Sequence, residues 1–198
     1  MEDFSFVERV LARLPAQPPS AFAFQHWPHA KRPTDEGLAL APVPGVDPER
    51  LIAAVMDVDN YVGNVQHVAQ SRSIADARYT PPQAVRFYQR VEIPVIGAVH
   101  HELVLHDLGE RAGYRVAAWN LLGPATDALS KREAVRSDYN AGAWLVAPGV
   151  VGYALASAPR RGDVGYLKFK ALTKGADLAA SRVLEANIAG MAAWAQRR

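Results

Sequence analysis

A series of strand-like segments between residues 66 and 158 limits the possible folds of this chain more than any other feature. Segments rich in Val, Tyr, Phe, Trp and Leu alternate with turn residues, such as the LGERAG sequence at 108–113. Because the connections are short, the strands are expected to form one antiparallel sheet in which sequence neighbours pair. Six strands are predicted, at about 68–75, 84–93, 98–107, 113–122, 131–146 and 150–158.

Another strand and a helix are predicted before this series. Residues 37–42 form a short strand candidate, and the sequence VDPERLIAAVMDVDNYVGN follows it. Asp47 can cap the free amides of a helix there, and Pro48 suits its first turn. The helix is predicted to end at Gly63 or Asn64, because both residues favour helix termini.

A long C-terminal helix is predicted over about 167–196. Its apolar stripe includes Leu184, Ile188 and Met191, while charged residues lie on the other side. Several alanines and Gly190 give the helix little bulk. They allow close packing against the sheet, or leave space for a ligand beneath the helix.

The N-terminal 36 residues are expected to be an appendage to the main domain. Phe4, Val7 and Leu11 recur at helical spacing, which predicts an amphipathic helix. Five prolines between 15 and 33 then predict a connector without regular helix or central strand. The length of 198 residues favours a single globular unit, assigned to 37–198.

Composition removes several classes of protein. The chain has no cysteine, which excludes disulfides, thiolate zinc sites and cysteine nucleophiles. It has no uninterrupted apolar run of about 18 residues and no basic, apolar start, so a soluble cytoplasmic protein is expected. The net charge of +2 does not indicate a nucleic-acid partner.

Several stretches resemble the START family, lipid-transfer domains within the larger helix-grip and polyketide cyclase-like superfamily. They are VPGVDPERLIAAVMDVDNYVGNV, YQRVEIPVIGAVHHELVL, SDYNAGAWLVAP and the helix at 167–196, within a resemblance that spans about 37–196. The resemblance implies an α+β helix-grip fold, in which a curved antiparallel sheet of about six to seven strands wraps around the C-terminal helix. It also implies a hydrophobic tunnel for one lipid or similar molecule.

The sequence departs from the family at one pair of positions. Many members have an Arg-Asp pair after the proline turn, where this chain has His101 and Glu102. A histidine can change its charge near neutral pH, unlike an arginine. The ligand of a particular relative therefore cannot be carried over.

Alternation along the strands predicts which side chains face the interior. The more apolar face of each strand is taken as inward, and this choice places some polar groups among apolar ones. Buried polar groups need partners, either one another or a ligand. The predicted inward polar groups include Ser137, and the predicted ligand-binding residues are Phe87, Gln89, His101, Leu103, Leu105, Asn120, Tyr139, Tyr153, Ile188 and Met191.

The VHHELVLH stretch at 99–106 suggests a metal site at first sight, but its spacing does not fit one. His106 lies four residues beyond Glu102, roughly 13 Å along a strand, so one ion cannot bind both together with His100. No metal and no cofactor are predicted. His100, Glu102 and His106 are expected on a solvated outer face.

The sequence thus favours a non-catalytic protein that binds, transfers or senses a lipid or other hydrophobic small molecule. One alternative is an aromatase/cyclase-like enzyme that uses His101, Tyr139 and Arg136 for acid/base chemistry. Another is a ligand-regulated protein-interaction module. Transient contact with an anionic membrane is expected through a basic cluster of Arg160, Arg161, Lys168 and Lys170.

Overall fold

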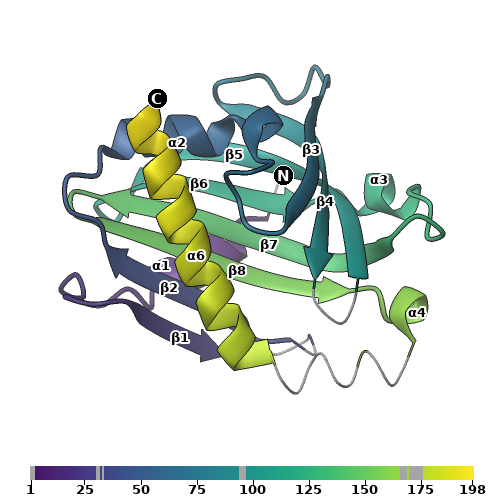
Figure 1. Ribbon diagram of the computed structural model, residues 1–198, viewed down its shortest axis with the longest axis horizontal. Coiled ribbons are helices and arrows are strands. Elements are labelled where there is room, and N and C mark those ends of the chain that lie inside the picture. Colours follow the sequence, from purple (N-terminus) through teal and green to yellow (C-terminus); the bar gives the residue numbers. More distant parts are fainter. Residues whose placement is uncertain (1–2, 30–31, 33, 94–96, 166–168, 170–175) are drawn as a thin grey trace.

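The structure, a computed structural model, is built on one eight-stranded sheet (Figure 1). It describes residues 3–29, 32, 34–93, 97–165, 169 and 176–198. Neighbouring strands run antiparallel in the order β1-β2-β8-β7-β6-β5-β4-β3, and β5 and β7 share a short parallel pairing. The strands are β1 (Ala23–Trp27), β2 (Glu36–Pro42), β3 (Val68–Ile74), β4 (Ala84–Ile93), β5 (Gly97–Arg111), β6 (Tyr114–Leu121), β7 (Val135–Ala147) and β8 (Val150–Pro159).

Helices cover both faces of this sheet. The helix α6 (Ala176–Arg197) crosses one face, which we call the inner face, and α2 (Pro48–Met56) lies near the C-terminal end of α6 (Figure 1). The helix α1 (Ser5–Leu11) packs on the opposite, outer face. Short helical turns complete the fold: η1 (Val58–Asn60), α3 (Gly123–Asp127) and α4 (Arg161–Val164).

The sheet therefore separates two apolar cores. The inner core joins alternate residues of the strands to α2 and to Ile188 and Met191 of α6. The outer core joins the other residues of β2, β6, β7 and β8 to Phe6, Val7 and Val10 of α1. Because both faces are buried, the central strands have little contact with solvent.

Most elements follow the sequence expectation, although β5 ends four residues later and β7 begins four residues later than predicted, and two differences are larger. Asp47 caps α2 as predicted, accepting hydrogen bonds from the amides of Glu49 and Arg50 at 2.9 and 3.2 Å. The helix ends at Met56 rather than Gly63, because the backbone leaves the helical region at Asp57 and continues into η1. The predicted start of the C-terminal helix lies outside the described residues.

The second difference concerns the N-terminal segment. The stretch expected to be a connector contains β1, which pairs with β2 from Ala23↔Leu40 to Trp27↔Glu36. No proline lies between Ala21 and Trp27, so nothing there blocks the hydrogen bonds of an edge strand. The sheet thus extends to residues before position 37.

Among the described residues, no helix is both long and apolar enough to cross a bilayer.

Candidate functional site

The inner face beneath α6 carries most of the predicted ligand-binding residues. Phe87 of β4 and Tyr153 of β8 belong to the inner core, as do Leu103 and Leu105 of β5. Ile188 and Met191 meet them from α6 and are 1% and 0% exposed. The alternation of β4 and β5 thus has the predicted direction, while contact with a ligand stays a prediction.

A row of polar side chains interrupts this apolar face. Gln89 of β4 stands opposite Ser71 of β3 on one side and opposite His101 of β5 on the other. The parallel pairing of β5 and β7 brings Ser137 next to His101. We call these four residues, Ser71, Gln89, His101 and Ser137, the polar row.

The hydrogen bonds of the polar row fix the tautomer of His101. Its Nε2 lies 3.1 Å from Gln89 Oε1, and its Nδ1 lies 2.9 Å from Ser137 Oγ. A carboxamide oxygen only accepts, so Nε2 carries the proton and donates it to Gln89. The Ser137 hydroxyl then donates to Nδ1, which accepts. Both ring nitrogens are satisfied.

Electrostatics keep His101 neutral. Burial lowers the pKa of His101 to about 3, with a smaller effect in the same direction from His100. The sequence suggested a group whose charge changes near neutral pH, and this expectation is wrong. A ring that is 2% exposed cannot be solvated as a cation.

Ser71 is the member of the row with an unsatisfied group. Residues opposite each other in an antiparallel pair face the same side, so Ser71 points inward with Gln89. Its neighbour Arg72 points outward, with its guanidinium 4.7 Å from the Tyr88 ring centre. The Ser71 hydroxyl oxygen is buried and has no hydrogen-bond partner among the described residues.

The sequence predicts an inward Asn120, and this prediction is wrong, because the residue lies on the outer face. Its side-chain nitrogen donates to the backbone oxygen of Asp3 at 3.1 Å, beside α1. Ala117 and Trp119 of β6 belong to the inner core, whereas Val116 and Ala118 belong to the outer core. The prediction chose the more apolar face as inward, but α1 makes the outer face equally apolar.

Tyr139 also lies on the outer face, because of a β-bulge in β7. Ser137 pairs with Pro159 and Tyr139 with Ala158, which leaves Asp138 as the extra residue. The bulge reverses the alternation, so Ser137 points inward and Tyr139 points outward. There the Arg32 guanidinium covers the Tyr139 ring at 3.5 Å from its centre.

The same reversal places residues on the inner face that sequence reasoning missed. Trp144 belongs to the inner core, and Asn140 accepts a hydrogen bond of 2.8 Å from the Trp119 indole nitrogen. Gly142 lies beneath that indole, where a Cβ would come within 2.0 Å of a Trp119 ring carbon. The sequence signal that could have indicated this face was the glycine two positions before Trp144, because a glycine in a strand often marks a close approach of another group.

The outward residues of VHHELVLH are not a solvated face. His100 is 1% exposed, and its Nδ1 lies 3.3 Å from the Tyr88 hydroxyl. His106 is half-buried, with its ring against Phe4 at a centre distance of 5.4 Å. Glu102 accepts hydrogen bonds from Arg86 at 2.5 and 2.9 Å.

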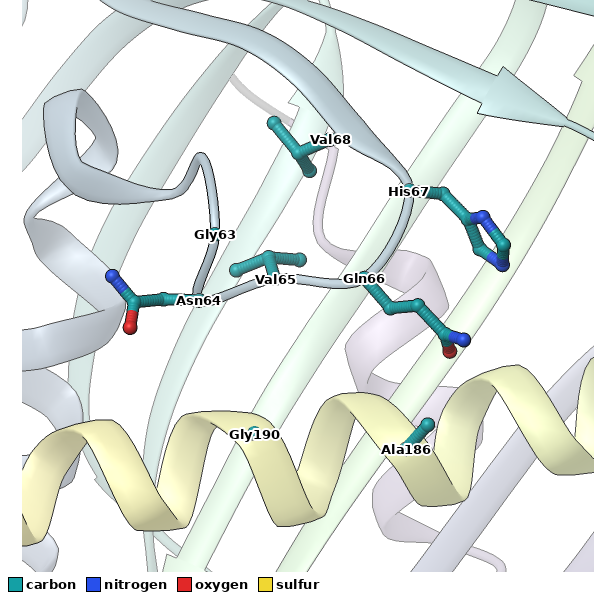
Figure 2. Close-up of a pocket in the computed structure, with 8 residues that line it drawn as sticks. All are labelled: Gly63, Asn64, Val65, Gln66, His67, Val68, Ala186 and Gly190. Carbon is teal, nitrogen blue, oxygen red and sulfur yellow. The ribbon is translucent and has the colours of Figure 1, made fainter.

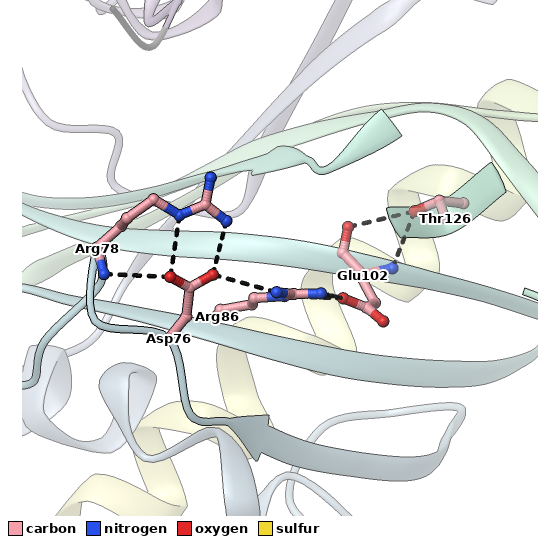
Figure 3. Close-up of polar contacts among 5 residues, drawn as sticks. All are labelled: Asp76, Arg78, Arg86, Glu102 and Thr126. Atoms are coloured by element: carbon pink, nitrogen blue, oxygen red, sulfur yellow. Dashed lines mark hydrogen bonds and ion pairs between the residues drawn. The ribbon is translucent and has the colours of Figure 1, made fainter. Parts of the chain in front are cut away.

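Figure 3 shows that Glu102 belongs to a chain of charges on the outer face. Arg86 bridges Glu102 to Asp76, and Asp76 is also held by Arg78. At the other end, the Thr126 hydroxyl accepts from the Glu102 amide at 3.0 Å. The hydrogen bonds from Arg78 and Arg86 hold the pKa of Asp76 far below its usual range. The chain of charges ties the β3–β4 connection to β4, β5 and α3.

The acid/base set suggested by the sequence is not assembled. His101 and Tyr139 lie on opposite faces, and Arg136 is bound to Asp163 by hydrogen bonds of 2.8 and 2.9 Å. Nor does the described part of the chain contain a group of three His, Asp or Glu side chains placed to hold a metal ion.

A cleft opens beside α6, and its lining differs from the predicted set of binding residues. It has a volume of about 480 Å³ and lies between residues 63–68 and the helix. Figure 2 shows this segment passing over Ala186 and Gly190, with the Gln66 side chain directed toward α6. Val68 lines the cleft and also belongs to the inner core, so the cleft borders the interior.

The segment at 63–68 is held against α6 by two hydrogen bonds and approaches it closely at Gly190. The Asn187 side chain accepts a hydrogen bond of 2.8 Å from the Gln66 amide, and Arg197 donates to the Asn64 side chain at 3.0 Å. At Gly190 a Cβ would lie 2.9 Å from the Asn64 backbone oxygen. The small residue Gly190 thus permits a close approach between the helix and the segment at 63–68, rather than between the helix and the sheet.

Part of the predicted basic cluster can be located. Arg160 pairs with Asp127, and Arg161 begins α4. Lys168 and Lys170 lie outside the described residues.

Comparison with known proteins supports the architecture. No family model matches the chain, and no curated protein matches it in sequence. Among solved structures, the STAR-related lipid transfer protein fragment from Xanthomonas axonopodis is 11% identical, with a TM-score of 0.69 over 91% of this chain and 97% of that one. Human STARD10 is 13% identical, with a TM-score of 0.72 over 100% of this chain and 84% of that one.

The solved structure of an enzyme is also similar to this chain, with a lower TM-score. The Zhui aromatase/cyclase from Streptomyces sp. R1128 is 12% identical, with a TM-score of 0.51 over 89% of this chain and 96% of that one. These likenesses agree with an antiparallel sheet closed by a C-terminal helix. The chain has the helix-grip fold of START domains.

Proposed function

We propose that the protein binds a lipid or another hydrophobic small molecule between the inner face of the sheet and α6. The observation that carries the proposal is the largely apolar inner face, which a single helix closes and which has a cleft at its border. Burial of apolar surface would supply most of the affinity, at about 25 cal/mol per Å². Solved structures of the same fold include lipid-transfer proteins, which supports this class of ligand.

Access is proposed through the cleft between residues 63–68 and α6. Val65 and Val68 line the cleft and contact the inner core. A ligand that entered there would meet the apolar interior once the contacts at Gly190 and Asn187 opened. Ile188 and Met191, which point from α6 into that interior, would then line its path.

A reversible cross-link would test both parts of this proposal. The chain has no cysteine, so the Gln66→Cys/Ala186→Cys variant would contain only the designed disulfide, whose formation mass spectrometry would verify. The apolar dye N-phenylnaphthylamine should fluoresce with the reduced variant and bind far more slowly to the oxidised one. Each single-cysteine variant is the matched control and should bind the dye equally under both conditions.

The outcomes separate the two parts. Binding at equal rates in both redox states would contradict the access route alone. A native protein that binds neither the dye nor any component of a lipid extract, by native mass spectrometry, would contradict hydrophobic ligand binding itself.

Transfer between membranes and a cytoplasmic location remain predictions from the sequence. Charge reversal at Lys168 and Lys170 should weaken binding to vesicles of anionic phospholipid, measured by sedimentation, if this region touches a membrane. Unchanged sedimentation would dispose of the membrane contact without affecting ligand binding. The acid/base set suggested for the alternative enzyme does not converge, because His101 and Tyr139 lie on opposite faces and Arg136 is bound to Asp163.

A further inference from the structure

The polar row gives the proposed ligand site a chemical preference. We propose that it selects hydrophobic ligands whose polar end is an uncharged hydrogen-bond acceptor, a carbonyl or hydroxyl oxygen. Gln89 and Ser71 would donate to that oxygen, and His101 and Ser137 would act as positioning residues. This inference rests on the proposed function, since it concerns the same site.

The direction of the hydrogen bonds assigns the contacting role to Gln89. Its amide oxygen is occupied by His101 Nε2, so its amide nitrogen is the group left to bind a ligand. Gln89 is half-buried, whereas His101 and Ser137 are 2% and 1% exposed. A ligand on the inner face would therefore reach Gln89 rather than its two more deeply buried neighbours.

Ser71 supplies an independent observation. Its hydroxyl oxygen is buried next to Gln89 and has no partner in the described part of the chain. Leaving such a group unpaired costs about 1–3 kcal/mol. A ligand oxygen placed between Ser71 and Gln89, within the otherwise apolar inner face, would satisfy it.

The charges around the row decide between neutral and anionic ligands. The buried residues that the structure describes include no lysine and no arginine. Glu36, the buried carboxylate, lies on the other side of the sheet with Arg9. The chain of Arg86, Glu102 and Asp76 is also on the outer face. An anionic group beside Gln89 would thus be buried without a cation, which is costly.

A matched pair of ligands would test this preference. Methyl dodecanoate and dodecanoate share one alkyl chain, and at about pH 8 only the second is charged. Displacement of N-phenylnaphthylamine gives the affinity of each for the full-length protein. Methyl dodecanoate is expected to bind at least about tenfold more tightly, equivalent to about 1.4 kcal/mol.

Two variants examine the donors. Ser71→Ala breaks no existing hydrogen bond and should weaken methyl dodecanoate binding about two- to tenfold. Gln89→Glu keeps the oxygen that accepts from His101 but replaces the donor by an acceptor, so it should weaken the ester at least as much. Gln70→Glu is the matched control, because Gln70 is exposed on the neighbouring strand.

The positioning role of His101 has its own measurement. His101→Phe would release the Gln89 side chain, so methyl dodecanoate should bind more weakly while the affinity for the dye stays unchanged. A protein that lost packing alone would lose the dye and both ligands together.

The results distinguish this inference from the proposed function. Failure of the dye and both ligands to bind would contradict the proposed function. Dye binding with equal or tighter binding of dodecanoate would overturn the preference alone. So would dye binding without displacement by the ester, or an ester affinity that is unchanged in both Ser71→Ala and Gln89→Glu.

Discussion

Trp119 and Gly142 pack closely together on the inner face. A Cβ on residue 142 would lie 2.0 Å from the Trp119 ring, and the indole is also held by Asn140. Gly142→Ala is therefore expected to lower the free energy of unfolding by about 3 kcal/mol, a strong case of overpacking. Urea denaturation would measure it.

Gly123→Ala is the control for this substitution. A Cβ at Gly123 meets nothing within 4 Å, so its stability should change by less than about 0.5 kcal/mol. Equal stabilities for the two variants would show that Trp119 can move away from Gly142 without cost.

The pKa of His101 predicts a pH dependence of stability. Burial lowers the pKa to about 3 in the folded protein, whereas an unfolded histidine titrates near 6.5. Between these values the unfolded chain binds one more proton than the folded chain, so stability falls as the pH falls. The contribution is about 1.4 kcal/mol per pH unit below about 6.5.

Replacement by glutamine removes this contribution and leaves His100 to titrate as before. The free energy of unfolding of His101→Gln should therefore decline less steeply than that of the native protein between about pH 6 and pH 4. Urea denaturation would measure both proteins. If their free energies of unfolding declined equally steeply with pH, His101 would take up its proton in the folded state as readily as in the unfolded state.

The positions of single residues were predictable where one face of a strand is much more apolar than the other. Phe87, Leu103 and Leu105 meet this condition, and they face inward as expected. Asn120 does not, because its strand is buried on both faces. Tyr139 could not be placed either, since counting alternate residues does not reveal a bulge at Asp138.

Among the elements, the segment at 63–68 and helix α6 form a junction that can be weakened selectively. Asn187 is 5% exposed and accepts the Gln66 amide from across the cleft. Asn187→Ala removes that acceptor, so exchange of the Gln66 amide hydrogen should accelerate about tenfold. Hydrogen exchange followed by NMR would measure it.

Gln196→Ala serves as the control on the same helix, because Gln196 is exposed. Its effect on the Gln66 amide should be negligible. An unchanged exchange rate in Asn187→Ala would show that other contacts hold this segment closed.

The order of elements was predictable because each strand of the series is long, apolar and separated by turn residues. β4, for example, has the boundaries 84 and 93 that the sequence predicts. The edge strand β1 was missed because nearby prolines favour irregular structure, although none lies within the strand itself. Where α2 ends was also beyond prediction, because the apolar stripe continues past Asp57 into η1.

For the whole molecule, the outer core makes α1 part of the fold. Glu36 is 0% exposed and accepts hydrogen bonds from Arg9 of α1 at 3.0 and 3.2 Å. The Trp27 indole donates to it at 2.6 Å. Burial alone would raise the pKa of Glu36, but these hydrogen bonds hold it below its ordinary value.

Removal of Arg9 should therefore be costly. Arg9→Leu leaves a buried carboxylate without its cation and is expected to lower the free energy of unfolding by about 3–5 kcal/mol. The second substitution Glu36→Gln should recover part of the loss. Arg50→Leu, at an exposed position of α2, is the control, and thermal denaturation compares the variants. A loss of stability as large in Arg50→Leu would contradict the stabilising role of the Arg9–Glu36 pair.

The two ends of the sheet have a consequence for association between copies of the chain. An edge strand can pair with another chain, and short, kinked or charged strands resist such pairing. At one end, β1 has five residues and Pro28 follows it immediately. At the other, β3 is bulged between Val68 and Gln70 and exposes Arg72. Neither end offers a long, flat template, so growth of this sheet into larger β-aggregates is opposed at both of its open sides.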